Sequence, residues 1–172
     1  AATVEDLMGF VQGPDFPTGA FILGKEGFKE AYRTGRGRVV MRAKAHVEDL
    51  KKRDRQAIIV TEIPYQQNKA TLLEKIAELV RDKRLEGISD LRDESNREGI
   101  RIVIELKKGE NHEVLLNNLY KSTPLQNTFG IIFMSILNGQ PRPLNLREML
   151  SVFVDFRREV VVRRTRFELR KA

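Results

Sequence analysis

The most regular pattern in the chain is an alternation of apolar and polar residues over 38–47. One set of alternate positions is apolar and consists of Val39, Met41, Ala43, Ala45 and Val47. A period of two is typical of a half-buried β-strand. A second run at 56–63 is rich in β-branched residues, and a charged connection at 48–55 separates the two runs. The pattern therefore predicts a β-hairpin over residues 38–63.

Apolar residues at spacings of three and four predict two internal helices and a shorter one before them. The clearest apolar stripe, in a helix predicted over 68–84, consists of Leu72, Leu73, Ile76, Leu79 and Val80. Asn68 is the expected N-cap of this helix. A short helix is predicted over 25–32, and another over 111–121 with Val114, Leu115 and Leu119 in its stripe.

A long helix is predicted from about Asn145, which is its candidate N-cap. Its apolar stripe consists of Leu146, Met149, Leu150, Phe153, Phe156, Val160 and Phe167. Its second half is basic, with Arg157, Arg158, Arg163, Arg164, Arg166, Arg170 and Lys171. This helix is interpreted as the charged outer face of a bundle or coiled coil, and direct contact with DNA is the alternative. No glycine or proline ends it before Ala172, so we expect it to continue in a longer chain.

The remaining apolar runs are short and predict strands. We expect a buried strand at 20–23, a pair at 88–94 and 100–107, and a strand at 130–137 before the turn pair Asn138-Gly139. Residues 1–19 are expected to be loop, and the prolines that follow the turn pair, Pro141 and Pro143, are expected to break regular structure. Hairpins mixed with helices in this order predict an α+β fold. We expect a two-layer sandwich with a largely antiparallel sheet, followed by a long C-terminal helix.

The composition excludes several classes of protein. The chain of 172 residues is 41% hydrophobic, which suits one ordinary domain or one domain plus part of another. It has no cysteine and only two histidines, so disulfides, thiolate chemistry and a zinc site are not expected. No apolar run approaches the roughly 20 residues of a membrane span, and no signal peptide is visible. We expect a cytoplasmic protein without membrane contact.

The net charge of +7 points to a polyanionic partner, with nucleic acid first. The excess lies in residues 25–55, with 11 basic and 5 acidic side chains, and in residues 147–172, with 8 and 4. Residues 32–44 contain no acid. The candidate DNA-binding residues within them, here called the basic segment, are Arg33, Arg36, Arg38, Arg42 and Lys44.

Strand geometry favours phosphate contact by the basic segment. Alternate side chains on a strand face are about 6.6–7 Å apart, close to the roughly 7 Å between successive phosphates along one DNA strand. Gly37, between Arg36 and Arg38, would let the backbone approach a ligand closely. The alternative is a solvated sheet face whose charges prevent edge-to-edge aggregation.

Other chemistry is less well supported. Asp90, Asp93 and Glu94 invite a Mg²⁺ interpretation, but Arg92 stands among them and a regular strand places Asp90 and Asp93 on opposite faces, so a structural set of ion pairs is favoured. Gly35-Arg36-Gly37 is too short for a nucleotide loop, and no nucleophile lies beside a base. We predict no catalytic and no metal-binding residue in this chain.

Several long strings in the sequence resemble one family, the A subunits of bacterial DNA gyrase. They cover nearly the whole chain in unbroken order and are GPDFPTGA (13–20), EAYRTGRGRV (30–39), TEIPYQQNKA (61–70), EKIAELVRDKRLEGISDLRDES (74–95), GIRIVIELKK (99–108), LNNLY (116–120) and FRREVVVRRTRFELRKA (156–172). The corresponding A chains of topoisomerase IV share much of this pattern, although the C-terminal string looks more like gyrase.

The resemblance implies a place in a larger enzyme. Residues 1–144 correspond to the family's tower, or shoulder, domain, and residues 145–172 to the start of the long helix that leads to the C-gate coiled coil. The parent is then an ATP-dependent type II topoisomerase that cleaves both strands of one duplex, passes another through and introduces negative supercoils. By resemblance it is an assembly of two A and two B subunits, in which the gyrase B subunits supply the Mg²⁺ and ATP sites.

The resemblance also implies that this stretch does not cleave DNA. The family's catalytic tyrosine follows an arginine in an Arg-Tyr-Thr string upstream, whereas Tyr32-Arg33-Thr34 has the reverse order. Its expected role is to hold the arms of the bent, cleaved double-stranded DNA. A purely mechanical strut between the DNA gate and the C-gate is the alternative. An unrelated RNA-binding module is disfavoured, since no aromatic motif for stacking bases is present.

Overall fold

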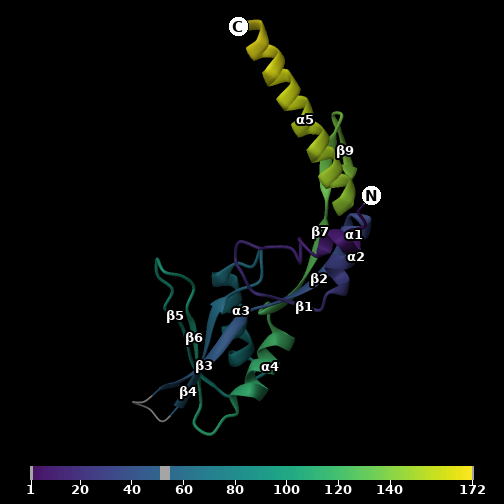
Figure 1. Cartoon of the computed structure of the whole chain (residues 1–172). Helices are drawn as coiled ribbons and strands as arrows, with labels where there is room; N and C mark the ends of the chain where they lie inside the picture. Colours follow the sequence, from purple (N-terminus) through teal and green to yellow (C-terminus); the bar gives the residue numbers. More distant parts are fainter. Residues whose placement is uncertain (1, 51–54, 172) are drawn as a thin grey trace. The chain divides into compact units, whose positions relative to one another are not determined.

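The computed structural model describes residues 2–50 and 55–171 (Figure 1). The chain divides into two compact units. The first contains Ala1–Pro14, Lys25–Val39 and Gly130–Ala172, and the second contains Asp15–Gly24 and Val40–Phe129. The predicted connection at 48–55 is described only at its two ends, because residues 51–54 lie outside the described residues.

The second unit is built on a four-stranded antiparallel sheet. Its strand order is β3 (Lys44–Leu50), β4 (Arg55–Glu62), β6 (Ile102–Leu106) and β5 (Ile88–Asp93). In the ladder Val47 pairs with Ile58, and Ile58 pairs with Ile104. The predicted hairpin is confirmed from Lys44 onward, and the predicted pair at 88–94 and 100–107 is confirmed as β5 and β6.

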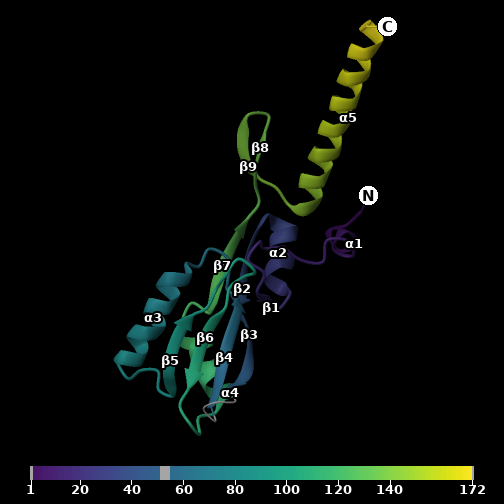
Figure 2. The same ribbon diagram turned by 90° about the vertical axis from the view of Figure 1, so that its left-hand side faces the viewer.

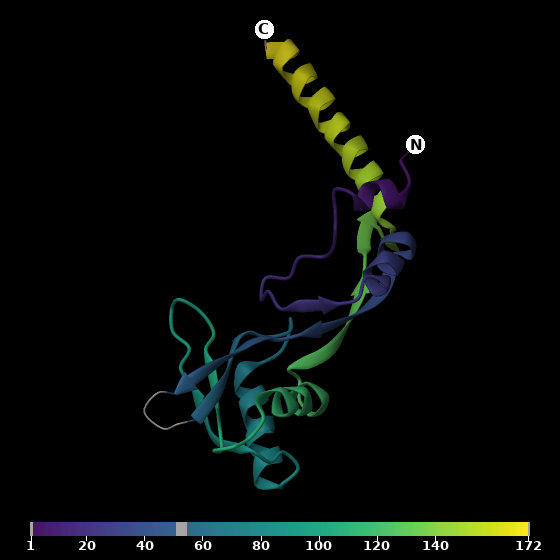
Figure 3. The same cartoon turned by 60° about the horizontal axis from the view of Figure 1, so that its bottom comes forward.

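Two helices, α3 (Lys69–Arg81) and α4 (His112–Ser122), pack against this sheet. Figure 2 shows α3 alongside the strands, and Figure 3 shows α4 from a second direction. Asn68 caps α3 as predicted, because its side chain accepts the N–H groups of Ala70 and Thr71 at 2.9 and 3.2 Å. The predicted stripe of α4 is corrected at Val114, which is 58% exposed, whereas the other two members are buried.

The core of this unit lies between the helices and one face of the sheet. Its fully buried aliphatic side chains come from β4, β6, α3 and α4 and include Ile58, Ile102, Ile104, Leu72, Ile76 and Leu119. A smaller cluster of Ala57, Ile59 and Val103 is buried on the other face. Removal of this much aliphatic surface from water makes the hydrophobic effect the main stabilising contribution here.

The predicted strand over 38–47 is interrupted, which corrects the sequence analysis. β2 (Arg36–Arg42) and β3 are separated at Ala43 and belong to different sheets. Both backbone groups of Ala43 leave the ladders, because its N–H donates to the Leu125 carbonyl (2.7 Å) and its carbonyl accepts from the Tyr120 hydroxyl (3.1 Å). Ala43 is nevertheless buried like Val39 and Met41, so the alternation of buried positions runs on through the break.

β2 forms a three-stranded sheet of order β1-β2-β7 with β1 (Phe21–Leu23) and β7 (Gln126–Ile132). β1 lies where a strand was predicted, and Ile22 pairs with Met41 in antiparallel register. The prediction that it is buried is wrong. Phe21 is 52% exposed, because β1 is an edge strand with β2 as its one neighbour in the sheet.

In the first unit, helix α2 (Glu26–Thr34) packs directly on the backbone of β2. A Cβ atom at Gly27 would lie 1.8 Å from the Arg38 carbonyl oxygen, and one at Gly37 would lie 2.2 Å from the Gly27 carbonyl oxygen. Only glycine permits this approach at both positions. Phe28 and Tyr32 of α2 are both buried, with ring centroids 5.8 Å apart.

The N-terminal residues contain a helix that was not predicted, α1 (Val4–Met8). Thr3 and Asp6 form a capping box around its first turn, in which each side chain accepts the backbone N–H of the other residue. A helix of five residues contributes little apolar periodicity, so the capping residues are its main signal.

The rest of the first unit is a hairpin and a long helix, which Figure 2 separates clearly. β8 (Met134–Leu137) and β9 (Gln140–Pro143) are joined by the predicted Asn138-Gly139 turn, in which both φ angles are positive (52° and 77°). The expectation that Pro141 and Pro143 break regular structure is wrong. They lie in β9 of a two-stranded sheet, where both strands are edges and the missing N–H groups are tolerated.

The long C-terminal helix is confirmed as α5 (Leu146–Lys171). Asn145 caps it, accepting the Glu148 N–H at 2.8 Å, while the Glu148 carboxylate accepts the Asn145 N–H at 2.9 Å. Together the elements form an α+β fold with antiparallel sheets and a long terminal helix, as predicted.

Candidate nucleic-acid interface

The basic segment is distributed over both units. Arg33 on α2 and Arg36 and Arg38 on β2 belong to the first unit, whereas Arg42 on β2 and Lys44 on β3 belong to the second. The apolar residues of β2 at 39 and 41 are buried, and this burial fixes the phase of the strand. The alternation of buried and more exposed residues therefore holds within β2 itself. DNA contact by the basic segment stays a prediction.

Arg36 and Arg38 are the cations of this segment that the fold leaves available. Both are exposed, and neither guanidinium group has a hydrogen bond or an ion pair to any residue the structure describes. A guanidinium group with its N–H donors directed to water binds phosphate oxygens in a planar, bidentate geometry. These two residues thus match the proposed chemistry most directly.

Two cations of the segment are paired with carboxylates. The Arg33 guanidinium donates to Glu5 Oε1, with Nη2 at 2.6 Å and Nε at 2.8 Å. This hydrogen bond lowers the pKa of Glu5 below its ordinary value. Lys44 Nζ lies 3.2 Å from Glu62 Oε1. A phosphate that binds either cation competes with an intrachain carboxylate.

Glu62 is itself held by the backbone. Its Oε2 accepts the Ala20 N–H at 2.6 Å, and this bond is the main cause that lowers the pKa of Glu62, with a smaller contribution from Lys44. The carboxylate is therefore charged at neutral pH and fixed at the end of β4. The fixed carboxylate in turn orients the ammonium group of Lys44 toward itself.

Arg42 differs because its partners are neutral. Its Nε donates to Gln126 Oε1 at 2.8 Å, and its guanidinium carbon lies 4.6 Å from the ring centroid of Tyr120. A cation over an aromatic face is attracted by the ring quadrupole without loss of its charge. Neither neighbour was singled out by the sequence as part of this site.

The expected role of Gly37 is corrected. Its missing side chain makes room for α2, where Gly27 and Ala31 lie closest, and not for a ligand. The glycine keeps the backbone of β2 close to the helix and thereby positions the flanking arginines. A close approach was correctly expected at this position, but the group that approaches is a helix of the same chain.

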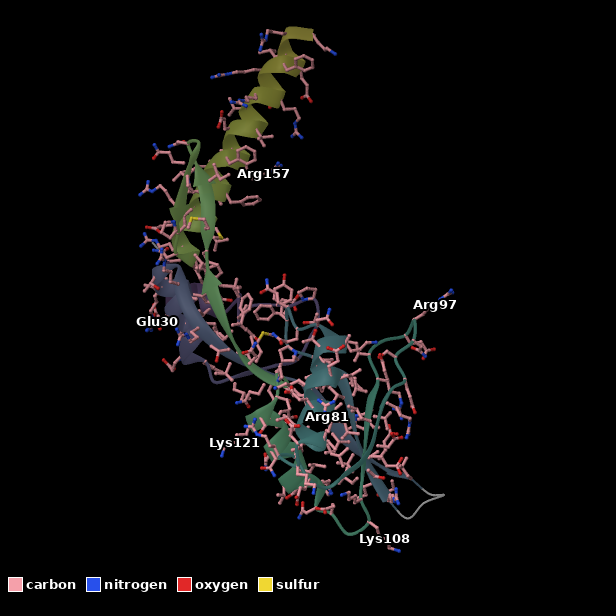
Figure 4. All side chains as sticks on the ribbon, turned by 180° about the vertical axis from the view of Figure 1, so that it is seen from behind. Glu30, Arg81, Arg97, Lys108, Lys121 and Arg157 are labelled. Atoms are coloured by element: carbon pink, nitrogen blue, oxygen red, sulfur yellow. The ribbon has the colours of Figure 1, made fainter. Side chains whose placement is uncertain are left out.

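The basic half of α5 carries local ion pairs. Arg163 bonds Glu159, and Arg158 lies 3.6 Å from Asp155. Figure 4 shows Arg157 on the surface of the helix. Beside these charges the predicted apolar stripe is largely uncovered, since Phe153 is 59% and Phe167 is 55% exposed while Leu146 is buried.

The acidic cluster in β5 consists of ion pairs. Asp90 and Glu94 both bond Arg92, and Asp93 bonds Lys69 of α3 at 2.7 Å. Lys69 and Ser95 lower the pKa of Asp93 to about 2. The structural interpretation is confirmed for these carboxylates. Over the described ranges 2–50 and 55–171, no group of three or more His, Asp or Glu side chains is arranged to hold a metal ion.

Sequence reasoning missed a larger ionic network on the sheet of the second unit. Glu105, 1% exposed, accepts from Arg55 and Arg92, each at 3.1 Å. Arg101, the residue before β6, binds Glu48 of β3 in a bidentate pair at 2.7 and 3.0 Å. Hydrogen bonds first from Arg101 and then from His46 lower the pKa of Glu48 to about 2. The one sequence feature that could have indicated this network is the acidic residue Glu105 within the apolar run of β6.

The three tyrosines occupy structural positions. Tyr32 is 2% exposed, stacks on Phe133 with ring centroids 5.9 Å apart, and has its pKa raised by burial. Tyr65 packs against Phe16 and Phe129. The Tyr120 hydroxyl donates to the backbone at the strand break.

Comparison with known proteins places the chain in a family. The family model of the DNA gyrase and topoisomerase IV A subunits matches residues 1–172, and the chain belongs to this family. It is 60% identical over 171 residues to the DNA gyrase A protein of Pseudomonas aeruginosa, covering 99% of this chain and 18% of the relative.

Two further relatives carry the same name. The chain is 59% identical over 170 residues to the DNA gyrase A protein of Escherichia coli, and 55% identical over 173 residues to that of Synechocystis. It covers 19% and 20% of them, while 99% of this chain is matched in each case. The chain thus spans about a fifth of the length of the curated relatives that it matches. Among the helices described, none is long and apolar enough to cross a membrane.

Proposed function

We propose that this chain is the tower domain of a DNA gyrase A protein and that it supports the arms of a bent duplex without cleaving it. In this proposal residues 1–144 form the tower and residues 145–172 begin the helix of the C-gate coiled coil. The parent is a type II topoisomerase that supercoils DNA negatively. The three relatives compared with this chain are named as gyrase subunits, which favours gyrase over topoisomerase IV.

The observation that carries the DNA-contact role is the pair of exposed guanidinium groups at Arg36 and Arg38. Bending a site of 20–30 base pairs requires on the order of 1–10 kcal/mol, and contacts to phosphates along the arms offset that energy. Phosphate contacts position a protein without reading sequence. This property suits an enzyme that acts at many sites. The remaining residues of the basic segment, Arg33, Arg42 and Lys44, contribute further positive charge.

Catalysis is assigned to other parts of the enzyme. The buried Tyr32 ring cannot reach a phosphate, and the aromatic packing of Tyr65 and the backbone bond of Tyr120 give these two residues structural roles. The acids of this chain that resembled a Mg²⁺ site do not fit one, because lysine and arginine side chains occupy their oxygens. From the resemblance to the family, we assign Mg²⁺ and ATP to the gyrase B subunits, within a complex of two A and two B subunits in the cytoplasm.

Charge reversal combined with duplex length tests this proposal. Arg38→Glu with Arg42→Glu should weaken the binding of long duplexes by the chain more than the binding of short ones, because only long duplexes have arms. The measurement is the dissociation constant for each length at one salt concentration. Equal losses on both lengths would count against an arm-binding role.

A mechanical strut is the second candidate, and α5 favours it. Its 26 residues correspond to about 39 Å of helix. Most of its apolar stripe is uncovered, as expected of a helix that packs against another helix. A strut without DNA contact predicts negligible duplex binding at any salt concentration. Binding that falls steeply with salt would reject it.

A further inference from the structure

We propose that Tyr120 and Gln126 are positioning residues that hold the Arg42 guanidinium group ready for a phosphate oxygen. This inference rests on the proposed DNA contact of the basic segment and adds two residues to it that are neither basic nor in that segment. All three residues belong to the second unit, so their geometry is that of one compact body.

The two partners leave the terminal Nη groups of the guanidinium group available. Gln126 takes the Nε–H at 2.8 Å, and the Tyr120 ring covers one face of the plane at 4.6 Å. The terminal Nη groups have no partner within the part of the chain that the structure describes. Since a phosphate is best bound through a pair of parallel N–H donors, the Nη edge is the one a duplex requires.

The partners of Arg42 are also neutral, and in this respect Arg42 differs from the two cations of the basic segment that form ion pairs. Arg33 and Lys44 are each paired with a carboxylate that a phosphate must displace. Arg42 is held by an amide oxygen and an aromatic face, so its charge is not cancelled. Such an arrangement orders the side chain and preserves its electrostatic attraction for DNA.

Tyr120 is anchored so that it can serve as a fixed platform. Its hydroxyl donates to the Ala43 carbonyl at 3.1 Å, at the break between β2 and β3, and its ring packs against the main core cluster. Burial raises the pKa of Tyr120 above its usual value of 10.0, so the phenol remains a neutral donor. The same residue therefore fixes the strand break and the cation beside it.

Preorganisation of this kind affects affinity in a characteristic way. An arginine that is mobile in the free chain loses rotamer freedom when it binds, and this loss weakens binding by roughly 2- to 10-fold for one immobilised side chain. Partners that order the side chain beforehand remove that loss. The number of phosphates contacted, and hence the salt dependence, is unaffected.

The test is a salt titration of the full chain with a labelled duplex of about 30 base pairs, between about 50 and 200 mM salt. Arg42→Ala should weaken binding and make the slope of log affinity against log salt shallower by about 0.9. Tyr120→Leu should weaken binding roughly 2- to 10-fold with an unchanged slope. Tyr120→Phe keeps the aromatic face but loses the hydroxyl anchor at Ala43, so it should weaken binding less than Tyr120→Leu does.

Three results separate the possibilities. If Arg42→Ala changes neither affinity nor slope, the proposed DNA contact fails at this residue, whatever its neighbours do. If Arg42→Ala weakens binding but Tyr120→Leu and Gln126→Leu do not, the positioning inference is wrong and the proposed function stands. If Tyr120→Leu weakens binding equally in the Arg42→Ala background, its role is structural only. Gln126→Leu, which spares the anchor at Ala43, decides the matter if Tyr120→Leu lowers the melting temperature.

Discussion

Replacement of Glu62 by glutamine is expected to strengthen DNA binding by releasing a cation of the basic segment. The Glu62 carboxylate now holds Lys44 at 3.2 Å. The amide in Glu62→Gln has nearly the same shape and can still accept the Ala20 N–H, so the local fold should be retained. What the substitution removes is the negative charge that competes with a phosphate for Lys44.

The size of the effect follows from the exposure of the pair. The two side chains are 52% and 33% exposed, so water screens their attraction, and such pairs are worth about 0–1 kcal/mol. Release of Lys44 should therefore raise affinity by up to roughly five-fold. If Lys44 then contacts a phosphate, the salt slope should steepen by up to about 0.9.

Fluorescence anisotropy with a labelled duplex at several salt concentrations measures both quantities. Glu26→Gln is the matched control, because Glu26 is paired with Lys29 at 3.1 Å outside the basic segment and its loss changes the net charge by the same amount. Equal gains in the two variants would show that net charge alone acts. No gain for Glu62→Gln would remove Lys44 from the interface.

The remaining predictions concern stability and are measured by urea unfolding. Gly27→Ala should lower the free energy of unfolding by about 1–3 kcal/mol, because the new Cβ meets a backbone oxygen. Gly130→Ala is the control and should be tolerated, because its new Cβ meets no atom within 4 Å. Equal effects of the two substitutions would contradict the packing of α2 on β2. The lowered pKa of Glu48 means that its contribution is full above 4.5 and is lost as pH falls toward 2. Glu48→Gln should therefore make stability less dependent on pH in that window, and an unchanged profile would exclude this carboxylate. Phe156→Ser, at an exposed position of α5, should change the free energy of unfolding by less than about 0.5 kcal/mol. Leu146 is buried, so Leu146→Ala should lower the free energy of unfolding by about 2–5 kcal/mol. A large loss for Phe156→Ser would mean that Phe156 belongs to the core.

The sequence predicted those elements whose cause is local. The apolar stripe and the Asn68 cap determine α3, and the Asn138-Gly139 pair determines the turn of the β8–β9 hairpin, because each requires only residues within a few positions. The capping box at Thr3 and Asp6 was also a local signal for α1, and it was overlooked.

The strand break at Ala43 could not be predicted because its cause is distant. The alternation of buried residues runs through it without a change of phase, and the groups that take its backbone hydrogen bonds come from Tyr120 and Leu125. The separation in sequence between Tyr120 and Ala43 is 77 residues. Periodicity describes which side of a strand is buried and carries no information on which sheet it joins.

The candidate site shows the same limit. Charge counting identified the basic segment as an unusual stretch of sequence, but it gave every cation equal weight. The structure distinguishes them through partners that are remote in sequence, such as Glu5, 28 residues from Arg33, and Gln126, 84 residues from Arg42. Tertiary contacts of this kind decide whether a charge is cancelled, oriented or left available.

The salt dependence of duplex binding by the chain tests the central claim most directly. If Arg36 and Arg38 each contact a phosphate, log affinity should fall with log salt at a slope of about −1.8 or steeper, and Arg36→Glu with Arg38→Glu should remove about that amount. Affinity that does not depend on salt, or a slope that survives the double charge reversal, would contradict the claim that this segment holds DNA.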